Sequence, residues 1–228
     1  MRTKAYRHST FLEVADSVYF NKEYMTRYMH GLALTAFIWP NHVDMRRFFE
    51  KSLPRKKTGH YLEIGPGHGF YFMTAMQLGA FKHFTGVDIS KTSVDLTRQI
   101  VGHHFPAEIR PVEIMESDFL QSTVSDGPFD AIVMGEVLEH VERPHDFLAR
   151  IADLAGPQTH IFITTCVNAP AIDHIYLYRS TEEVVEMIEA AGLKVKDTYI
   201  GAYFGKSLEQ SRRQNLPINI AFVLEKVR

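Results

Sequence analysis

The sequence predicts an α/β fold in which a parallel sheet is covered by helices on both faces. Between residues 60 and 165, short apolar runs alternate with amphipathic segments, as expected for right-handed strand–helix–strand units. The first apolar run ends in a glycine-rich loop, Gly65 to Gly69, which opens a helix. The second run ends in Asp88, about 20 residues after that loop. These three observations indicate a doubly wound sheet that binds a nucleotide-like ligand.

The predicted elements follow one another in a regular order. Strands are expected near residues 60–65, 84–88, 109–115, 129–134 and 159–165, with helices near 69–79, 91–103 and 143–155. The last of these helices has Pro144 in its first turn, and the next helix begins at a capping box, Ser180 to Glu183. Two further strands, about 194–204 and 218–227, complete the set. Because the stretch between them has no helical pattern, we expect them to form an antiparallel pair.

Residues 1–56 are predicted to form a helical N-terminal cap, and residues 57–228 the sheet domain, within a single structural domain overall. From Lys22 to Phe37 an apolar face recurs at three- and four-residue spacing. Its members are Tyr24, Met25, Tyr28, Met29, Leu32 and Ala36. Pro40 ends this helix, and a second is expected over 41–53. The apolar face could cover a ligand pocket, pack against the domain or form a homodimer contact.

Composition excludes several classes of protein. The chain of 228 residues fits one domain, and its formal charge of −2 provides no global field for nucleic acid or anionic membranes. Cys166 is the single cysteine, which excludes an internal disulfide, fits a reducing cytosol and is expected to be a buried thiol. The longest apolar run, residues 31–39, is too short to span a bilayer. We therefore expect a cytoplasmic protein that does not act on membranes.

Four motifs carry a resemblance to a known family. The pattern Glu63-x-Gly65-x-Gly67-x-Gly69 resembles motif I of class I S-adenosylmethionine-dependent methyltransferases, whereas a nicotinamide fingerprint would read G-x-G-x-x-G. Asp88, the Asp118-Phe119 pair and the segment 129–141 follow in the family's order. The resemblance implies a Rossmann-like seven-stranded sheet with an antiparallel last strand at its edge. It also implies an enzyme with S-adenosylmethionine as cofactor.

The same resemblance assigns the cofactor-binding residues. They are Glu63, Gly65, Gly67, Gly69, Asp88, Ile89, Asp118 and Phe119. The glycines would allow close approach of the methionine portion, and Glu63 would face its amino group. Asp88 would hold the ribose diol with Ile89 against the adenine, while Asp118 and Phe119 would bind the adenine amino group and ring. Two alternatives stay open, in which Asp88 only caps a helix and Asp118 only forms a turn.

The segment after the fourth strand carries the candidate chemistry of the acceptor side. If it turns helical, Glu136, Glu139 and His140 lie at i, i+3 and i+4 and share one face. Two carboxylates 4 Å apart repel by about 4 kcal/mol at an effective dielectric constant of about 20. The pair therefore needs a cation, a shared proton or good solvation. A metal ion would meet that need.

The later segment Asp173-His174 extends this resemblance. A Glu-x-x-Glu-His segment followed by an Asp-His-aromatic segment resembles plant small-RNA 2′-O-methyltransferases of the Hua-enhancer type, and quinone O-methyltransferases of the UbiG type share the first segment. The resemblance implies one divalent ion, Mg²⁺, Mn²⁺, Fe²⁺ or Zn²⁺. Its ligands would be Glu136, Glu139, His140 and His174. Without an ion, His140 or His174 would be the general base, and Glu136 completes the predicted catalytic set.

We expect a methyltransferase that acts on a small organic acceptor, most simply at oxygen with the help of the metal. RNA 2′-O-methylation is the alternative that the metal motif suggests, but the chain has no long basic stripe. Methylation of nitrogen or carbon with a histidine base and no metal is another. A third alternative comes from a different class of protein, namely a regulatory subunit that binds the cofactor without catalysis.

Overall fold

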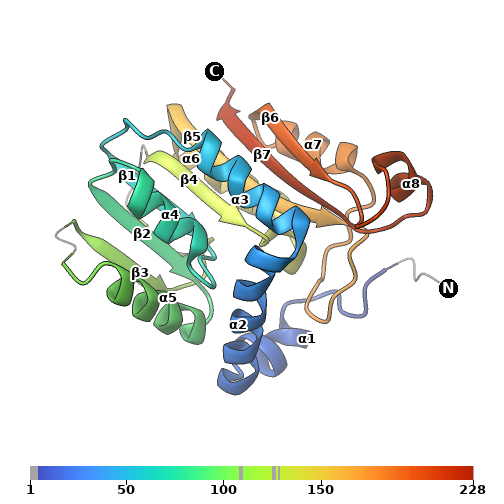
Figure 1. Ribbon diagram of the computed structural model, residues 1–228, viewed down its shortest axis with the longest axis horizontal. Helices are drawn as coiled ribbons and strands as arrows, with labels where there is room; N and C mark the ends of the chain where they lie inside the picture. The colour runs from blue at the N-terminus through green and yellow to red at the C-terminus, as the bar shows by residue number, and fades with distance from the viewer. Residues whose placement is uncertain (1–4, 108–109, 125–126, 128, 228) are drawn as a thin grey trace.

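The computed structural model describes residues 5–107, 110–124, 127 and 129–227. Seven strands form one sheet in the order β3-β2-β1-β4-β5-β7-β6 (Figure 1). The strands are β1 His60–Ile64, β2 His83–Asp88, β3 Val112–Glu116, β4 Phe129–Gly135, β5 Ala155–Val167, β6 Leu193–Gly201 and β7 Ile218–Lys226. The first five run parallel, and β7 is antiparallel to both of its neighbours. The strand order reverses between β1 and β4, where doubly wound sheets bind ligands beyond the carboxyl ends of their strands.

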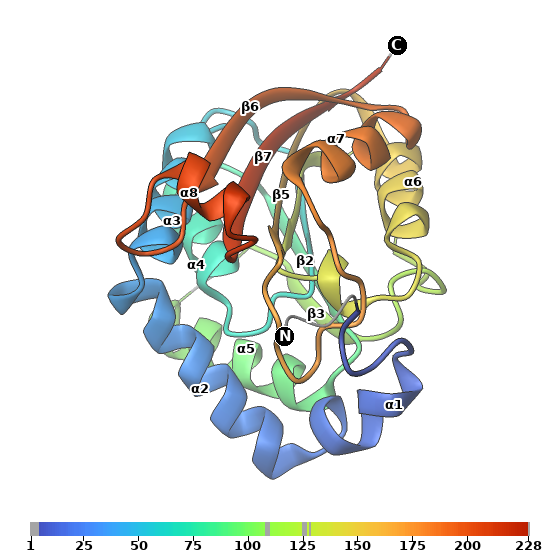
Figure 2. The same ribbon diagram turned by 90° about the vertical axis from the view of Figure 1, so that its right-hand side faces the viewer.

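Helices cover both faces of the sheet, as predicted (Figure 2). One layer contains α3 Pro40–Ser52, α4 Phe70–Leu78 and α5 Lys91–His104, and the other contains α6 Pro144–Leu154 and α7 Thr181–Ala190. Alternate residues of β1 pack against the two helix layers. Leu62 and Ile64 belong to the core cluster on the side of α6 and α7, and Tyr61 belongs to the cluster on the side of α3, α4 and α5. This two-sided burial explains why β1, β4 and β5 are apolar along most of their length.

Phe49 joins the cap to the sheet. Its ring is fully buried in α3 and lies 4.9 Å from the ring of Phe162 on β5. We expect Phe49→Ala to lower the free energy of unfolding by about 3–5 kcal/mol, because it leaves a cavity beneath α3. Urea unfolding followed by circular dichroism measures this, with Leu34→Ala as the control since Leu34 is 62% exposed on α2. An equal effect of the two substitutions would contradict the packing described.

The structure corrects two expectations about the last two strands, concerning the stretch between them and the strand at the edge of the sheet. The stretch between them does hold a helix, α8 Leu208–Arg213, which begins at a capping box formed by Ser207 and Gln210. The antiparallel pairing of β6 with β7 is confirmed, but β7 lies between β5 and β6, so the edge strand is β6. The burial of the two strands explains the order. Residues Ile220 to Leu224 of β7 are buried on both faces, whereas β6 carries exposed Lys194 and Lys196, as edge strands often do.

The N-terminal segment lies across the carboxyl ends of the strands. Its main helix, α2 Lys22–Ile38, contacts α5 and buries Met25, Met29 and Ala36, which belong to the predicted apolar face. Before it come α1 Leu12–Val14 and a π-helical turn, Ala15–Tyr19, which the sequence did not predict. We call residues 11–19 the strap. Two hydrogen bonds of its backbone hold it to the domain: the Ser90 hydroxyl donates to the Tyr19 carbonyl (2.8 Å), and Phe11 N–H donates to Glu142 (2.8 Å). In the described part of the chain, no helix is long and apolar enough to cross a bilayer.

Candidate active site

A cavity of about 420 Å³ lies at the carboxyl ends of β1, β2 and β4. Its floor is the glycine loop and the ends of these strands, and its roof is the inner face of α2 and the first turns of α3. All of the predicted site residues line it except Gly69. The structure thus brings the predicted cofactor residues and the predicted acceptor residues into one chamber.

The glycine loop has a backbone that only glycine adopts without strain. Gly65 has φ +66°, and a Cβ there would lie 2.6 Å from Val137 Cγ2. Gly67 has φ +52° and lies beneath Met29 of α2. Gly69, at φ +76°, is the residue before α4 and supports the turn without lining the cavity. Glycine at these positions lets Val137 and Met29 pack directly against the loop, and the backbone of Gly65 and Gly67 lines the cavity.

Asp88 is a buried carboxylate oriented by two backbone donors. Its Oδ1 accepts from Ser90 N–H (2.9 Å) and its Oδ2 from Gly67 N–H (3.3 Å). Burial raises the pKa of Asp88 to about 6, and the two backbone hydrogen bonds oppose that rise. The N-cap of α5 is Ser90, whose hydroxyl accepts from Ser93 N–H, so Asp88 is not merely a helix cap. Each carboxylate oxygen keeps a lone pair for a hydroxyl donor in the cavity.

Asp118 and Phe119 line the cavity, as Ile89 does. Asp118 accepts from Leu120 N–H (3.0 Å) and from Gln121 Nε2 (3.0 Å), which is the turn role left open by the sequence. Phe119 is buried and its ring lies 5.6 Å from the ring of Phe147. The pair can bind a flat apolar ring with a polar edge, because a carboxylate lies next to an aromatic face.

On the acceptor side, Glu136 is held in a strained conformation. Its φ is +51°, and its N–H donates to the Thr164 carbonyl (3.1 Å) while its Oε1 accepts from the Thr164 hydroxyl (2.7 Å). Only Leu138–His140 form a helical turn, of the 3₁₀ type. The condition of a helix with Glu136, Glu139 and His140 on one face is therefore not met, since the backbone turns left-handed at Glu136, where it bonds to Thr164 of β5.

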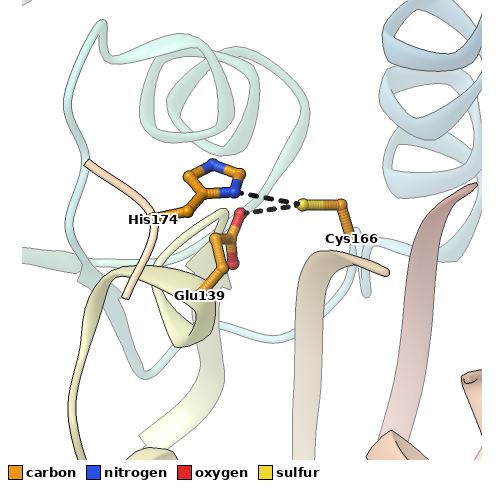
Figure 3. Close-up of side chains that lie close together, drawn as sticks. All are labelled: Glu139, Cys166 and His174. Atoms are coloured by element: carbon orange, nitrogen blue, oxygen red, sulfur yellow. Dashed lines mark hydrogen bonds between the residues drawn. The ribbon is translucent and has the colours of Figure 1, made fainter. Parts of the chain in front are cut away.

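Glu139 is completely buried beside Cys166 and His174 (Figure 3). Its Oε2 accepts from the Thr165 hydroxyl (2.8 Å), and its Oε1 lies 3.7 Å from the Cys166 thiol. Burial and then the neighbouring Glu136 carboxylate raise the pKa of Glu139 well above its usual value. Burial likewise raises the pKa of the Cys166 thiol, which is buried as predicted and therefore protonated at neutral pH.

His140 and His174 face each other with ring centroids 4.7 Å apart. His174 Nδ1 lies 2.6 Å from the Ala169 carbonyl, and His140 Nδ1 lies 3.1 Å from the Asp173 carbonyl and 3.3 Å from its Oδ2. Carbonyl and carboxylate oxygens only accept, so each Nδ1 carries a proton and Nε2 is the ring nitrogen left to face a ligand. Burial, followed by the charge of His140, lowers the pKa of His174 to about 4.

Histidines are the basic side chains that contact this cluster of carboxyl groups in the described part of the chain, as His140 does with Asp173. In the regions that the structure describes, no lysine or arginine forms an ion pair with Glu136, Glu139 or Asp173. Asp173 is fully buried, and its Oδ1 has no hydrogen-bond partner. Two groups have ligand atoms close enough to share one ion: Glu139, Cys166 and His174, and His140, Asp173 and His174. Buried carboxylates that lack a cation need protons or a metal, so the donor set fits a divalent ion.

The sequence reasoning missed three residues of the cavity. Asp173 joins the cluster, and its place directly before His174 was the available signal. Tyr19 reaches it from the strap, with its hydroxyl 3.4 Å from Asp173 Oδ2. Arg46, on α3, lines the cavity; its buried Nε has no hydrogen-bond partner but lies 3.7 Å from Glu50 Oε1 in an i,i+4 ion pair. No sequence signal separates Arg46 from its exposed neighbour Arg47.

Comparisons with known proteins agree with this geometry. A family model for a methyltransferase domain matches residues 41–198, so the match begins within α3. A ubiquinone biosynthesis O-methyltransferase of Pseudoalteromonas translucida is 22% identical over 186 residues, covering 73% of this chain and 76% of that protein. One from Glaesserella parasuis is 32% identical over 130 residues, covering 56% and 53%. The chain spans 41% of a mitochondrial relative from Dictyostelium discoideum, at 26% identity over 136 residues.

Solved structures show the same fold at low sequence identity. A phosphoethanolamine N-methyltransferase of Haemonchus contortus, in complex with S-adenosylmethionine, superposes with a TM-score of 0.69 at 15% identity, covering 97% of this chain and 61% of that one. A cyclopropane synthase of Mycobacterium tuberculosis has a TM-score of 0.62 at 14% identity, with 81% and 84% covered.

The sheet order, the glycine loop and the acid after β2 define a class I S-adenosylmethionine-dependent methyltransferase. The chain belongs to the family of methyltransferase domains.

Proposed function

We propose that this enzyme transfers the methyl group of S-adenosylmethionine to an oxygen atom of a small, partly apolar organic acceptor, with a divalent ion at the acceptor end. The observation that carries the proposal is the buried cluster of carboxylates and imidazoles at one end of the cofactor cavity. The relatives named as ubiquinone biosynthesis O-methyltransferases support oxygen as the methylated atom.

The cavity wall favours a small molecule over RNA. Its roof is apolar, with Met25, Met29 and Leu32 of α2 facing inward. Among the described residues that line it, the basic side chains that carry a permanent charge are Arg46 and Arg143, against seven acids. RNA recognition depends on phosphate contacts from clustered basic residues, so this lining argues against it.

The residues proposed to hold the ion are Glu139, His140 and His174, with Asp173 and Glu136 beside them. His174 is the member common to both close groups, and binding of the ion would draw Glu139 and His140 together around it. Both histidines donate Nδ1–H to backbone carbonyls, an arrangement that orients Nε2 ligands in metal sites. A divalent ion bound there would lower the pKa of an acceptor hydroxyl toward neutrality. The chain itself would hold the acceptor oxygen in line with the methyl carbon, at about 3–3.5 Å, and exclude water through α2 and the strap.

Chelation tests the ion directly. Methyl transfer to a panel of phenolic and catecholic acceptors, followed by mass spectrometry, should be abolished by treatment with a chelator and restored by a divalent metal. Binding of S-adenosylhomocysteine, measured by calorimetry, should change little because the cluster lies at the acceptor end. Full activity of enzyme shown to be metal-free by elemental analysis would remove the ion and leave an imidazole as the base.

A further inference from the structure

Tyr61 and Glu63 form a buried pair at the start of the glycine loop. They lie two residues apart on β1, so their side chains point to the same face of the sheet. The Tyr61 hydroxyl donates to Glu63 Oε2 at 2.5 Å, and the two residues are 0% and 2% exposed. Glu63 also lines the cavity, whereas Tyr61 lies behind it.

The tyrosine ring is buried among aromatic neighbours. Three phenylalanine rings surround it with centroids 5.5–5.7 Å away, namely those of Phe72, Phe81 and Phe84. Among the described residues, Tyr61 is the sole side-chain donor to the Glu63 carboxylate. The bond therefore fixes one carboxylate oxygen and leaves the other for a ligand in the cavity.

The surroundings of Glu63 otherwise oppose its negative charge. Burial raises the pKa of Glu63 to about 8, the hydrogen bond from Tyr61 lowers it, and the Asp88 carboxylate on β2 raises it. Among the described residues, Tyr71 of α4 is a further titratable group that interacts with Glu63. Tyr61 is thus the group nearby that stabilises the ionised carboxylate.

We propose that Tyr61 is a positioning residue for the cofactor, whose hydroxyl favours the ionised form of Glu63 and orients it so that its free oxygen receives the α-ammonium group of S-adenosylmethionine. The inference rests on the cofactor-binding role assigned to Glu63. Tyr61 itself does not touch the cofactor, and its effect is specific to the amino-acid portion of the ligand.

Two probes separate this role from general packing. S-Adenosylhomocysteine carries the α-ammonium group, and 5′-methylthioadenosine has the same adenosine without the amino acid. We expect Tyr61→Phe to weaken S-adenosylhomocysteine about tenfold at pH 7, because a hydrogen bond to a charged group is lost. Affinity for 5′-methylthioadenosine should stay within about twofold, since no adenosine contact changes. Equal losses for the two ligands would overturn the proposal.

Tyr178→Phe is the matched control. Tyr178 is also fully buried, and its hydroxyl donates to Met187 on the opposite face of the sheet. This variant should lose some stability yet bind both ligands like wild type. If it weakens S-adenosylhomocysteine as much as Tyr61→Phe does, the effect is one of packing and the proposal fails.

A double-mutant cycle with Glu63→Gln shows whether Tyr61 acts through Glu63. If it does, Glu63→Gln weakens S-adenosylhomocysteine selectively, and adding Tyr61→Phe changes the affinity by less than about twofold. Additive losses would contradict the proposal. An unchanged affinity in Glu63→Gln would instead refute the role assigned to Glu63, whereas a selective loss in Glu63→Gln with none in Tyr61→Phe would refute only the role of Tyr61.

The pH profile gives an independent readout. The ammonium group requires ionised Glu63, so affinity for S-adenosylhomocysteine should rise as pH increases through about 8 in wild type. Loss of the Tyr61 hydrogen bond should move this rise to higher pH, and Glu63→Gln should remove the part that belongs to Glu63. A wild-type profile that Tyr61→Phe leaves unshifted would contradict the inference.

Discussion

His174→Ala should lower turnover by about 10²- to 10⁴-fold, while affinity for S-adenosylhomocysteine stays within about twofold of wild type. His174 belongs to both groups that could share an ion, and its ring lies at the acceptor end of the cavity. Its loss therefore removes either a metal ligand or the imidazole base without disturbing the glycine loop. Steady-state methyl transfer and calorimetry measure the two quantities. Glu139→Gln should show the same separation.

The control for this substitution is His145→Ala, on the exposed side of α6, which should retain wild-type turnover. Thermal unfolding must accompany both assays, because Glu139 and His174 are buried. A variant that loses stability but keeps turnover would mean that these side chains only pack, with no part in the reaction.

Asp88→Asn should weaken S-adenosylmethionine by about 2–3 kcal/mol, since two hydroxyl groups of the ribose lose a charged acceptor. Turnover should recover at saturating cofactor. The wild-type affinity should also fall as pH drops through about 6, because protonation of the Asp88 carboxyl removes the same acceptor. Asp95→Asn, at an exposed position of α5 in the same region, is the control. An unchanged affinity in Asp88→Asn would refute the ribose contact.

The local patterns of the sequence predicted most of the fold. The strand, glycine loop and helix around Gly65 to Gly69 are encoded within a few residues, as are the caps at Ser90 and Ser180. The position of β7 between β5 and β6 depends on pairing between distant segments, which a single sequence does not specify. The sequence analysis did not predict the short helix α8, although the Ser207-x-x-Gln210 capping box is a signal for a helix start.

The site was predictable as a set of residues but not as a geometry. The motifs named Asp88 and Glu139 correctly as members of the cavity, because the carboxyl ends of parallel strands meet at one edge of the sheet. The conformation of Glu136 could not be predicted, since Thr164 on β5 imposes it from 28 residues away. The Tyr61–Glu63 bond was visible only as two polar residues in an apolar strand.

The most direct test of the proposed function is an anomalous difference map. Crystals of the enzyme with S-adenosylhomocysteine, soaked in Mn²⁺ or Zn²⁺ and measured on both sides of the absorption edge of the metal, would show where an ion binds. The proposal predicts one strong peak within bonding distance of Glu139, His140 and His174. A map without a peak there, from crystals whose enzyme methylates its acceptor, would contradict a metal-assisted mechanism.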